Sequence, residues 1–226
     1  MLESLISFDK IVTLAINGSS NLYLDNLALA ISSTWVWLPL ALVLLYVLIR
    51  SNDLSGIFLC VAALALCITL ADQGASTICK PLFERFRPTQ DPSMMYQVDV
   101  VNNYRSGLYG FISSHAANTF AVAVFLSRIV NYKRLRICLY SWALLNCWSR
   151  VYLGVHFFGD VLVGGCYGAL IGFCISCFFH RVQRRRERKQ SLLSLPKYDR
   201  RDVSLLSFAF ILTFVFVTFL PLFTIN

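Results

Sequence analysis

Long apolar runs separated by short polar stretches dominate the hydropathy pattern of the chain. A membrane-spanning helix needs about 20 mostly apolar residues. Five runs meet or approach this length, at residues 26–49, 54–79, 113–130, 159–180 and 203–224. A sixth run, at 136–152, is shorter and has Ser149 and Arg150 near its end. The pattern therefore predicts an all-α integral membrane bundle of six transmembrane helices.

The segment before the first run has a different pattern. In residues 1–18, Leu, Ile and Val alternate with Glu3, Asp9 and Lys10. This is typical of an amphipathic helix that lies in the membrane interface without crossing it. Because the start lacks a basic stretch followed by a short apolar core, we expect no cleavable signal peptide. The first span would then act as the targeting signal.

Composition supports a membrane protein and adds a strongly basic segment. The chain is 57% hydrophobic and 14% charged, whereas about 25% charged residues is usual in soluble domains. Much of the net charge of +8 lies in residues 181–189, as Arg181, Arg184, Arg185, Arg186, Arg188 and Lys189. Because apolar runs flank this block, we expect residues 181–202 to form a cytoplasmic loop beside anionic lipid. We expect no nucleic-acid partner.

The eight cysteines lie within or beside apolar runs. This placement favours small hydrophobic side chains over a disulfide framework. Cys174 and Cys177 form a C-x-x-C pair inside one run, where we expect neither a redox nor a zinc role.

The loops are expected to divide unequally between the two membrane faces. Six crossings would place both termini and the loops at 80–112 and 153–158 on one face. The other face would carry the loops at 50–53, 131–136 and 181–202, in which lysine and arginine are more numerous. The positive-inside rule predicts that these basic loops are cytoplasmic. The first face would then point out of the cytoplasm.

Ionisable residues next to spans are costly and are therefore functional candidates. The first group contains Lys80 and Arg87, followed by Pro88. Fixed cations beside a membrane suit a phosphate group, although anchoring in the interface is an alternative. The second group is Ser113, Ser114 and His115, directly before an apolar run. The free N–H groups of a helix start attract anions, although a serine cap with an incidental histidine is an alternative.

The third group extends from Ser149 to Asp160 and includes Arg150 and His156. His156 and Asp160 are four residues apart, so they would share one helix face. The aspartate would then orient the imidazole and favour its cationic form. The alternative is a His–Asp pair that only joins two spans. The third histidine of the chain, His180, is expected on the cytoplasmic side with a structural role.

Together the three groups suit phosphoryl transfer through a covalent intermediate on the extracytoplasmic face. We expect His156 to attack phosphorus, Asp160 to orient it, and His115 to protonate the leaving oxygen and then activate water. Charge on the phosphate would be neutralised by Lys80, Arg87, Ser113, Ser114 and Arg150. No group of residues on this face resembles a metal site, so neither a metal nor another cofactor is expected.

These residues resemble the signature of the type 2 phosphatidic acid phosphatase (PAP2) family, which is K-x6-R-P, then P-S-G-H, then S-R-x5-H-x3-D. The first and third parts match completely. In the middle part Ile112 stands for Pro and Ser114 for Gly, while Ser113 and His115 are kept. The resemblance implies six spans, a histidine nucleophile and no metal. The chain would be one PAP2-like domain, residues 1–226, with its core at about 24–180, the basic loop at 181–202 and the last span at 203–224.

The resemblance also gives an expected substrate class, a membrane lipid phosphate. Compact bacterial members of the family act on lipid A, undecaprenyl diphosphate or phosphatidylglycerophosphate. The form of residues 111–118 is most similar to lipid A phosphatases, so removal of the 4′-phosphate is expected first. Undecaprenyl diphosphate and phosphatidylglycerophosphate are the alternatives. A non-catalytic membrane scaffold is disfavoured because both histidines and Asp160 are present, and a vanadate haloperoxidase is disfavoured by the predicted spans.

A long loop separates the first two groups. Residues 89–111 contain Met94, Met95 and Tyr96. Loops of this length are usually functional or disordered. We expect a lid that selects the lipid head group and dips residues 94–96 into the interface.

Overall fold

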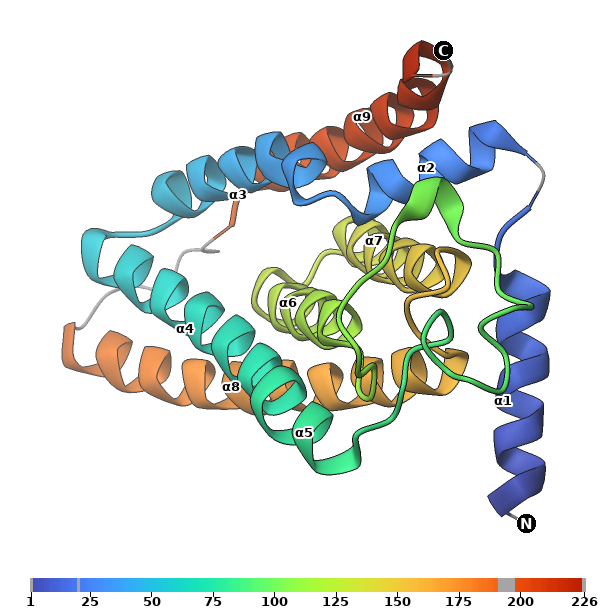
Figure 1. The fold of residues 1–226 in the computed structure, drawn as a ribbon. Helices are drawn as coiled ribbons and strands as arrows, with labels where there is room; N and C mark the ends of the chain where they lie inside the picture. Colours follow the sequence, from blue (N-terminus) through green and yellow to red (C-terminus); the bar gives the residue numbers. More distant parts are fainter. Residues whose placement is uncertain (1, 20, 191–197, 225–226) are drawn as a thin grey trace.

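The computed structural model describes residues 2–19, 21–190 and 198–224, and its regular elements there are all helical (Figure 1). The α-helices are α1 (Leu2–Ile16), α2 (Leu22–Ser32), α3 (Leu38–Ser51), α4 (Leu54–Gln73), α5 (Lys80–Phe83), α6 (Ser114–Val130), α7 (Lys133–Tyr152), α8 (Phe158–Gln190) and α9 (Arg200–Thr224). Short 3-10 turns occur at Thr34–Trp37 and Val101–Asn103, and a π-helical segment, Gly74–Cys79, joins α4 to α5. The all-α prediction is confirmed.

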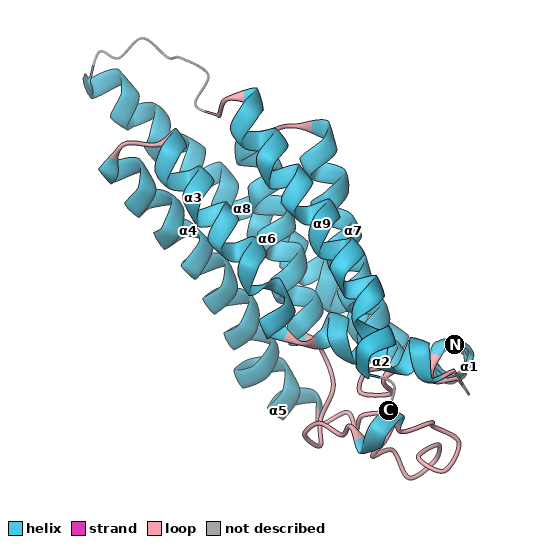
Figure 2. Ribbon diagram, turned by 90° about the horizontal axis from the view of Figure 1, so that it is seen from above, coloured by secondary structure: helices cyan, strands magenta, loops and turns pink. Residues whose placement is uncertain are grey.

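The long helices run side by side, and the longest irregular segments of the described chain gather at one end of them (Figure 2). Helix α6 lies in the middle of the bundle and contacts α4, α7 and α8 (Figure 1). The loops before α6 and α8 lie at the same end as α1. The three residue groups predicted from the sequence are therefore at one end of the bundle.

Four segments of the described chain are long and apolar enough to cross a membrane: Thr34–Ser51, Leu54–Phe83, Phe158–Arg188 and Arg200–Phe223. Helices α6 and α7 form where spans were predicted, but α6 has only 17 residues and α7 is more polar. About half of the residues in each are buried against other helices, so these helices need not be apolar on every side. The count of six spans stays a prediction.

Two predicted boundaries were wrong. The run at 26–49 is not one helix, because α2 stops at Ser32 and α3 starts after a 3-10 turn. Pro39 lies in the first turn of α3, where its missing N–H has no helical partner to lose. The basic block is not a loop, since α8 continues to Gln190; arginine is a good helix former. Residues 191–197 of the predicted loop lie outside the described residues.

A row of glycines brings α8 close to α6. Gly164, Gly168 and Gly172 are four residues apart and share one face of α8. A Cβ atom at Gly164 would lie 2.6 Å from the carbonyl oxygen of Ser113. At the other two glycines it would overlap the carbonyl groups of Ala117 and Ala121. Small residues permit this close backbone approach, which places the first turns of α6 and α8 side by side.

Candidate active site

The chain between α5 and α6 folds back on itself to place Arg87. Glu84 has a left-handed backbone, with φ of 44°, and ends α5. The backbone N–H of Arg87 then donates to the carbonyl oxygen of Leu108 at 3.1 Å. The N–H of Gly110 donates to the carbonyl oxygen of Arg85 at 2.8 Å. This short paired segment directs Arg87 toward the loop before α8.

The guanidinium of Arg87 is buried and held by two loops. It is 5% exposed. Its Nε donates to the carbonyl oxygen of Tyr109 at 3.1 Å, and its Nη1 donates to that of Val155 at 2.8 Å. Nη1 also lies 3.1 Å from Nε2 of His156. Because the guanidinium cannot accept a hydrogen bond, this contact places the lone pair of Nε2 toward Arg87 and the ring proton on Nδ1.

His156 lies in the turn between α7 and α8. Gly154 forms this turn with φ of 66°, where a Cβ atom would lie 2.7 Å from Cγ1 of Val98. Nδ1 of His156 faces Oδ2 of Asp160 at 3.6 Å. The same oxygen accepts the backbone N–H of Phe157 at 3.0 Å. The structure therefore brings the predicted His–Asp pair together, with the other ring nitrogen directed to Arg87.

The charge state of His156 differs from the one expected. Burial, followed by the positive charges of Arg87, Arg150 and Lys80, holds the pKa of His156 well below its usual value of 6.5. The ring is therefore neutral near pH 7, as a nucleophilic nitrogen requires. Asp160 was expected to favour a cationic imidazole, but burial and three nearby cations oppose that form. Burial and Arg150 likewise lower the pKa of Arg87, to about 10.

Asp160 forms an ion pair with a second arginine, Arg85, which was not among the predicted site residues. Nη1 of Arg85 donates to Oδ1 of Asp160 at 2.7 Å, and its Nη2 donates to Oδ2 of Asp9 at 2.6 Å. The guanidinium also lies 4.1 Å from the centre of the Phe157 ring. Asp9 accepts the backbone N–H of Gly159 at 2.7 Å. Asp9 thus connects helix α1 to the first turn of α8, which carries Asp160, the partner of His156.

The second predicted group lies at the start of α6. Ser113 caps the helix, and its Oγ accepts the N–H of Ala116 at 3.4 Å. Lys80 reaches this turn, because its Nζ donates to Oγ of Ser114 at 3.4 Å and to Oγ of Ser76 at 3.2 Å. The backbone N–H of Ser113 donates to the carbonyl oxygen of Asp160 at 3.0 Å. The helix start, Lys80 and the first turn of α8 therefore meet.

Arg150 approaches from α7 and is 2% exposed. Its Nη1 donates to the hydroxyl groups of Ser32 and Tyr104, the latter at 3.2 Å. Its Nε is buried and has no hydrogen-bond partner among the described residues. A buried donor of this kind is costly unless a ligand accepts from it. An anion in the site would supply that acceptor.

A cavity of about 370 Å³ borders Ser114 and His115. Its wall also includes Asp72 and Asn118, whose side chains are hydrogen-bonded at 3.4 Å. His115 therefore faces open space, as a group that acts on a bound substrate must. Among the described residues, no cluster of three or more His, Cys, Asp or Glu side chains could hold a metal ion.

Only part of the loop at 89–111 matches the expected position of residues 94–96, and its role as a lid stays a prediction. Met94 is only 3% exposed and packs with Val98, Phe157 and Leu14, so it does not dip into the interface. Tyr96, in contrast, is 88% exposed. Lys10 of α1 lies 3.7 Å from a carboxylate oxygen of Asp91, which ties the loop to α1.

The segment that carries the three groups matches a known family in sequence. The sequence profile of the PAP2 superfamily matches residues 41–188, which include every predicted site residue. The chain belongs to the PAP2 superfamily. The predicted recognition of a PAP2-type lipid phosphatase is thereby confirmed. The catalytic role of each residue stays a prediction.

Curated relatives and solved structures agree with this membership. The chain is 33% identical to the lipid A 4′-phosphatase of Bacteroides thetaiotaomicron over 186 residues, covering 82% of this chain and 83% of that protein. It is also 33% identical to the lipid A 4′-phosphatase of Porphyromonas gingivalis over 171 residues, covering 76% and 72%.

Among solved structures, the PAP2 type phosphatidylglycerolphosphate phosphatase of Bacillus subtilis superposes with a TM-score of 0.59 at 22% identity, covering 79% of this chain and 88% of that one. LpxE of Aquifex aeolicus superposes with a TM-score of 0.54 at 24% identity, covering 73% and 92%. At these identities the two structures show that this PAP2 protein shares their fold.

Proposed function

We propose that this PAP2 protein removes the 4′-phosphate of lipid A through a phosphohistidine intermediate on His156. The arrangement of Arg87, His156 and Asp160 carries the proposal, because it presents a neutral, oriented imidazole nitrogen beside a buried guanidinium. The names of the two curated relatives support this substrate.

The reaction would proceed in two displacements. Nε2 of His156 attacks phosphorus, and the bond from phosphorus to the sugar oxygen breaks. His115, protonated once the negative charge of the bound phosphate offsets the nearby cations, gives its proton to that leaving oxygen. Neutral His115 then takes a proton from water, the resulting hydroxide attacks phosphorus, and the P–N bond breaks to release phosphate. Arg87, Lys80 and Arg150 would stabilise the phosphoryl oxygens throughout.

The cavities favour a lipid-linked substrate over a soluble one. The cavity beside His115 shares Thr34, Trp37, Ile68, Val122 and Trp142 with a neighbouring cavity of about 360 Å³. The second cavity is almost wholly apolar, and it extends between the helices toward Leu206 and Phe210. A phosphate at the polar end would leave an attached hydrocarbon chain beside the apolar end. This continuity supports an amphipathic substrate.

We further propose six spans in a bacterial inner membrane, with the site facing the periplasm. The clustering of the catalytic groups at one end of the bundle and of the arginines at the far end of α8 supports this orientation. Reporter fusions after residues 104 and 190 test it. Opposite compartments are expected for the two fusions, and a periplasmic signal after residue 190 would contradict the proposal.

The function is tested with purified protein and four lipids: bis-phosphorylated lipid A, lipid A lacking the 4′-phosphate, undecaprenyl diphosphate and phosphatidylglycerophosphate. Phosphate release is expected only from the first, and mass spectrometry would show loss of one phosphate. His156→Ala should abolish release, while His180→Ala, at the other end of the bundle, should retain it. Faster release from either of the last two lipids would establish the alternative substrate.

The same assay tests the intermediate. Vanadate, which imitates pentacoordinate phosphorus, should inhibit the protein, whereas EDTA should not. Turnover by His156→Ala at the unmodified rate would show that another group is the nucleophile. Melting curves of both histidine variants in detergent show whether a loss of activity is a loss of folding.

A further inference from the structure

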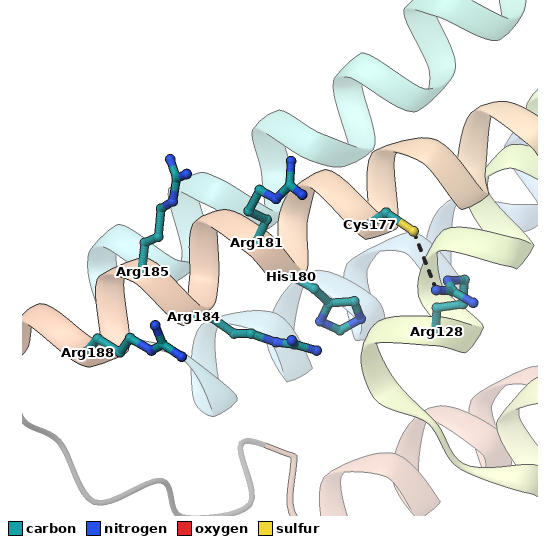
Figure 3. Close-up of a pocket in the computed structure, with 7 residues that line it drawn as sticks. All are labelled: Arg128, Cys177, His180, Arg181, Arg184, Arg185 and Arg188. Atoms are coloured by element: carbon teal, nitrogen blue, oxygen red, sulfur yellow. Dashed lines mark hydrogen bonds between the residues drawn. The ribbon is translucent and has the colours of Figure 1, made fainter.

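The end of α8 farthest from the active site presents a row of arginines on one side. Arg181, Arg184, Arg185 and Arg188, here called the arginine stripe, recur at intervals of three and four residues. At 3.6 residues per turn they fall within roughly 100° of the helix circumference. All four are exposed. Figure 3 shows them along one stretch of α8, with Arg128 of α6 opposite.

These four guanidinium groups differ from their neighbour Arg186. Arg186 lies on the other side of α8, where its Nη2 is 2.6 Å from Oδ1 of Asp53 and its Nη1 donates to Ser55 at 2.7 Å. No acidic side chain of the described residues forms an ion pair with the arginine stripe. Uncompensated cations gathered on one face attract an anion.

A hollow of about 410 Å³ lies against the stripe and is also lined by Arg128, Cys177 and His180. Arg128 is held in place, because its Nε donates to Oγ of Ser176 at 2.6 Å and its guanidinium lies 4.4 Å from the centre of the Phe173 ring. A second hollow of about 520 Å³ adjoins it and adds Arg136. A fixed arginine and a space of this size suit a head group rather than a bare ion.

The position of the stripe along α8 matches a lipid head group. Twenty-one residues separate Asp160 from Arg181, which is roughly 32 Å at 1.5 Å per residue. The hydrocarbon core of a bilayer is about 30 Å thick. With the active site at one membrane surface, the arginine stripe therefore lies at the other. Just inside it, Leu170, Phe173 and Phe178 are exposed on α8 and offer an apolar surface to acyl chains.

We propose that the arginine stripe and Arg128 bind the phosphate head group of an anionic phospholipid in the leaflet opposite the active site. The phosphate would lie between Arg128 and Arg184, with the acyl chains along the exposed apolar face of α8. This site is separate from the catalytic one, and its occupant is a phosphodiester lipid that is held rather than hydrolysed. The predicted anionic-lipid partner of the basic block thereby acquires a defined location.

The test measures lipid retained by the full chain in a nonionic detergent, by native mass spectrometry. Phosphatidylglycerol is compared with phosphatidylcholine. The stripe variant carries Gln at Arg181, Arg184, Arg185 and Arg188. The control variant carries Gln at Lys133, Arg134, Arg200 and Arg201, which removes equal charge at the same end of the bundle without altering the hollow.

We expect the stripe variant to lose at least about ten-fold in its preference for phosphatidylglycerol, since each surface arginine contributes roughly five-fold. The control should keep the preference. Equal losses in both variants would show general attraction and overturn the proposal, as would no loss in either. Displacement of the lipid by an equal concentration of inorganic phosphate would also overturn it, in favour of a soluble-anion site.

Phosphatase activity and melting temperature show whether each variant is folded. If the four-fold stripe variant does not fold, the pair Arg184→Gln and Arg185→Gln replaces it, with Lys133→Gln and Arg134→Gln as the matched control. A smaller but measurable loss confined to the first pair supports the site, and equal behaviour of the two pairs refutes it.

Discussion

Nη1 of Arg87 lies 3.1 Å from Nε2 of His156, so the guanidinium covers the nitrogen that is proposed to attack phosphorus. The same Nη1 is held by the carbonyl oxygen of Val155, one residue before the histidine. A phosphate that enters the site must draw the guanidinium from the ring onto its own oxygens. On the proposed mechanism, substrate binding would expose the nucleophile and neutralise the phosphate in one rearrangement.

Arg87→Lys tests whether the site needs only the positive charge of residue 87 or also the hydrogen-bonding geometry of its guanidinium. Lysine keeps the positive charge but cannot hold two carbonyl groups and a phosphate at once. We expect kcat/KM to fall by roughly 100-fold, comparable to losing one oriented donor at a developing charge. Arg105→Lys is the matched control, because Arg105 lies in the same loop and makes one bond, to the carbonyl oxygen of Thr89. Similar losses in both variants would indicate that the loop, and not the site, is disturbed.

The charge state of His156 can be measured directly, because the chain contains only three histidines. Ring ¹⁵N NMR in detergent should show a neutral His156 at pH 6.5 with its proton on Nδ1. Because its pKa is lowered, the active neutral form persists below pH 6.5, and it is lost only as pH falls through the folded-state pKa. The His156→Ala spectrum assigns the signal. An imidazolium signal for His156 at pH 6.5 would refute this assignment.

We expect Arg85 to be a positioning residue, which holds Asp160 in place beside His156. Arg85→Gln removes the bonds to both Asp160 and Asp9, so we expect kcat to fall by about ten-fold or more while KM changes little. Asp9→Asn should give part of the same loss. In the double variant the two effects should not add, because both act through one network. Additive losses would show that Asp9 and Arg85 act independently.

The limited space around Gly110, rather than its backbone conformation, should exclude a larger residue at this position. A Cβ atom there would lie 2.9 Å from Oδ2 of Asp160 and 3.5 Å from Nδ1 of His156. Gly110→Ala should therefore displace the His–Asp pair and lower kcat by roughly ten-fold or more, since small displacements of reacting groups are costly. Gly107→Ala is the control, because nothing lies within 4 Å of its added Cβ. Equal activity of the two variants would refute the steric role.

The sequence predicted the parts of the site that depend on local spacing. His156 and Asp160 are one helical turn apart, and Ser113 directly precedes a helix, so their relation follows from the chain itself. The contact between Asp9 and Arg85 joins residues 76 positions apart, so no local sequence pattern predicts it. Asp9 instead fitted the polar side of an interfacial helix. The only available signal was an acidic residue in a largely apolar segment.

The fold was predictable to a similar extent. Hydropathy located the helices but not the break after Ser32, where neither glycine nor proline marks the end. It also assigned the arginine block to a loop, because charge after an apolar run usually indicates one. Arginine favours helix as strongly as most apolar residues do, so the helix continues until the described segment ends at Gln190.

The row of glycines on α8 affects the geometry of the active site. His115 and His156 belong to different segments, and the spacing between α6 and α8 sets how far apart the proposed proton donor and the proposed attacking nitrogen lie. That spacing is set by the absence of side chains at Gly168 and Gly172, two and three helical turns along α8 from Asp160. On the proposed mechanism, the catalytic rate would therefore depend on positions that do not contact the substrate phosphate.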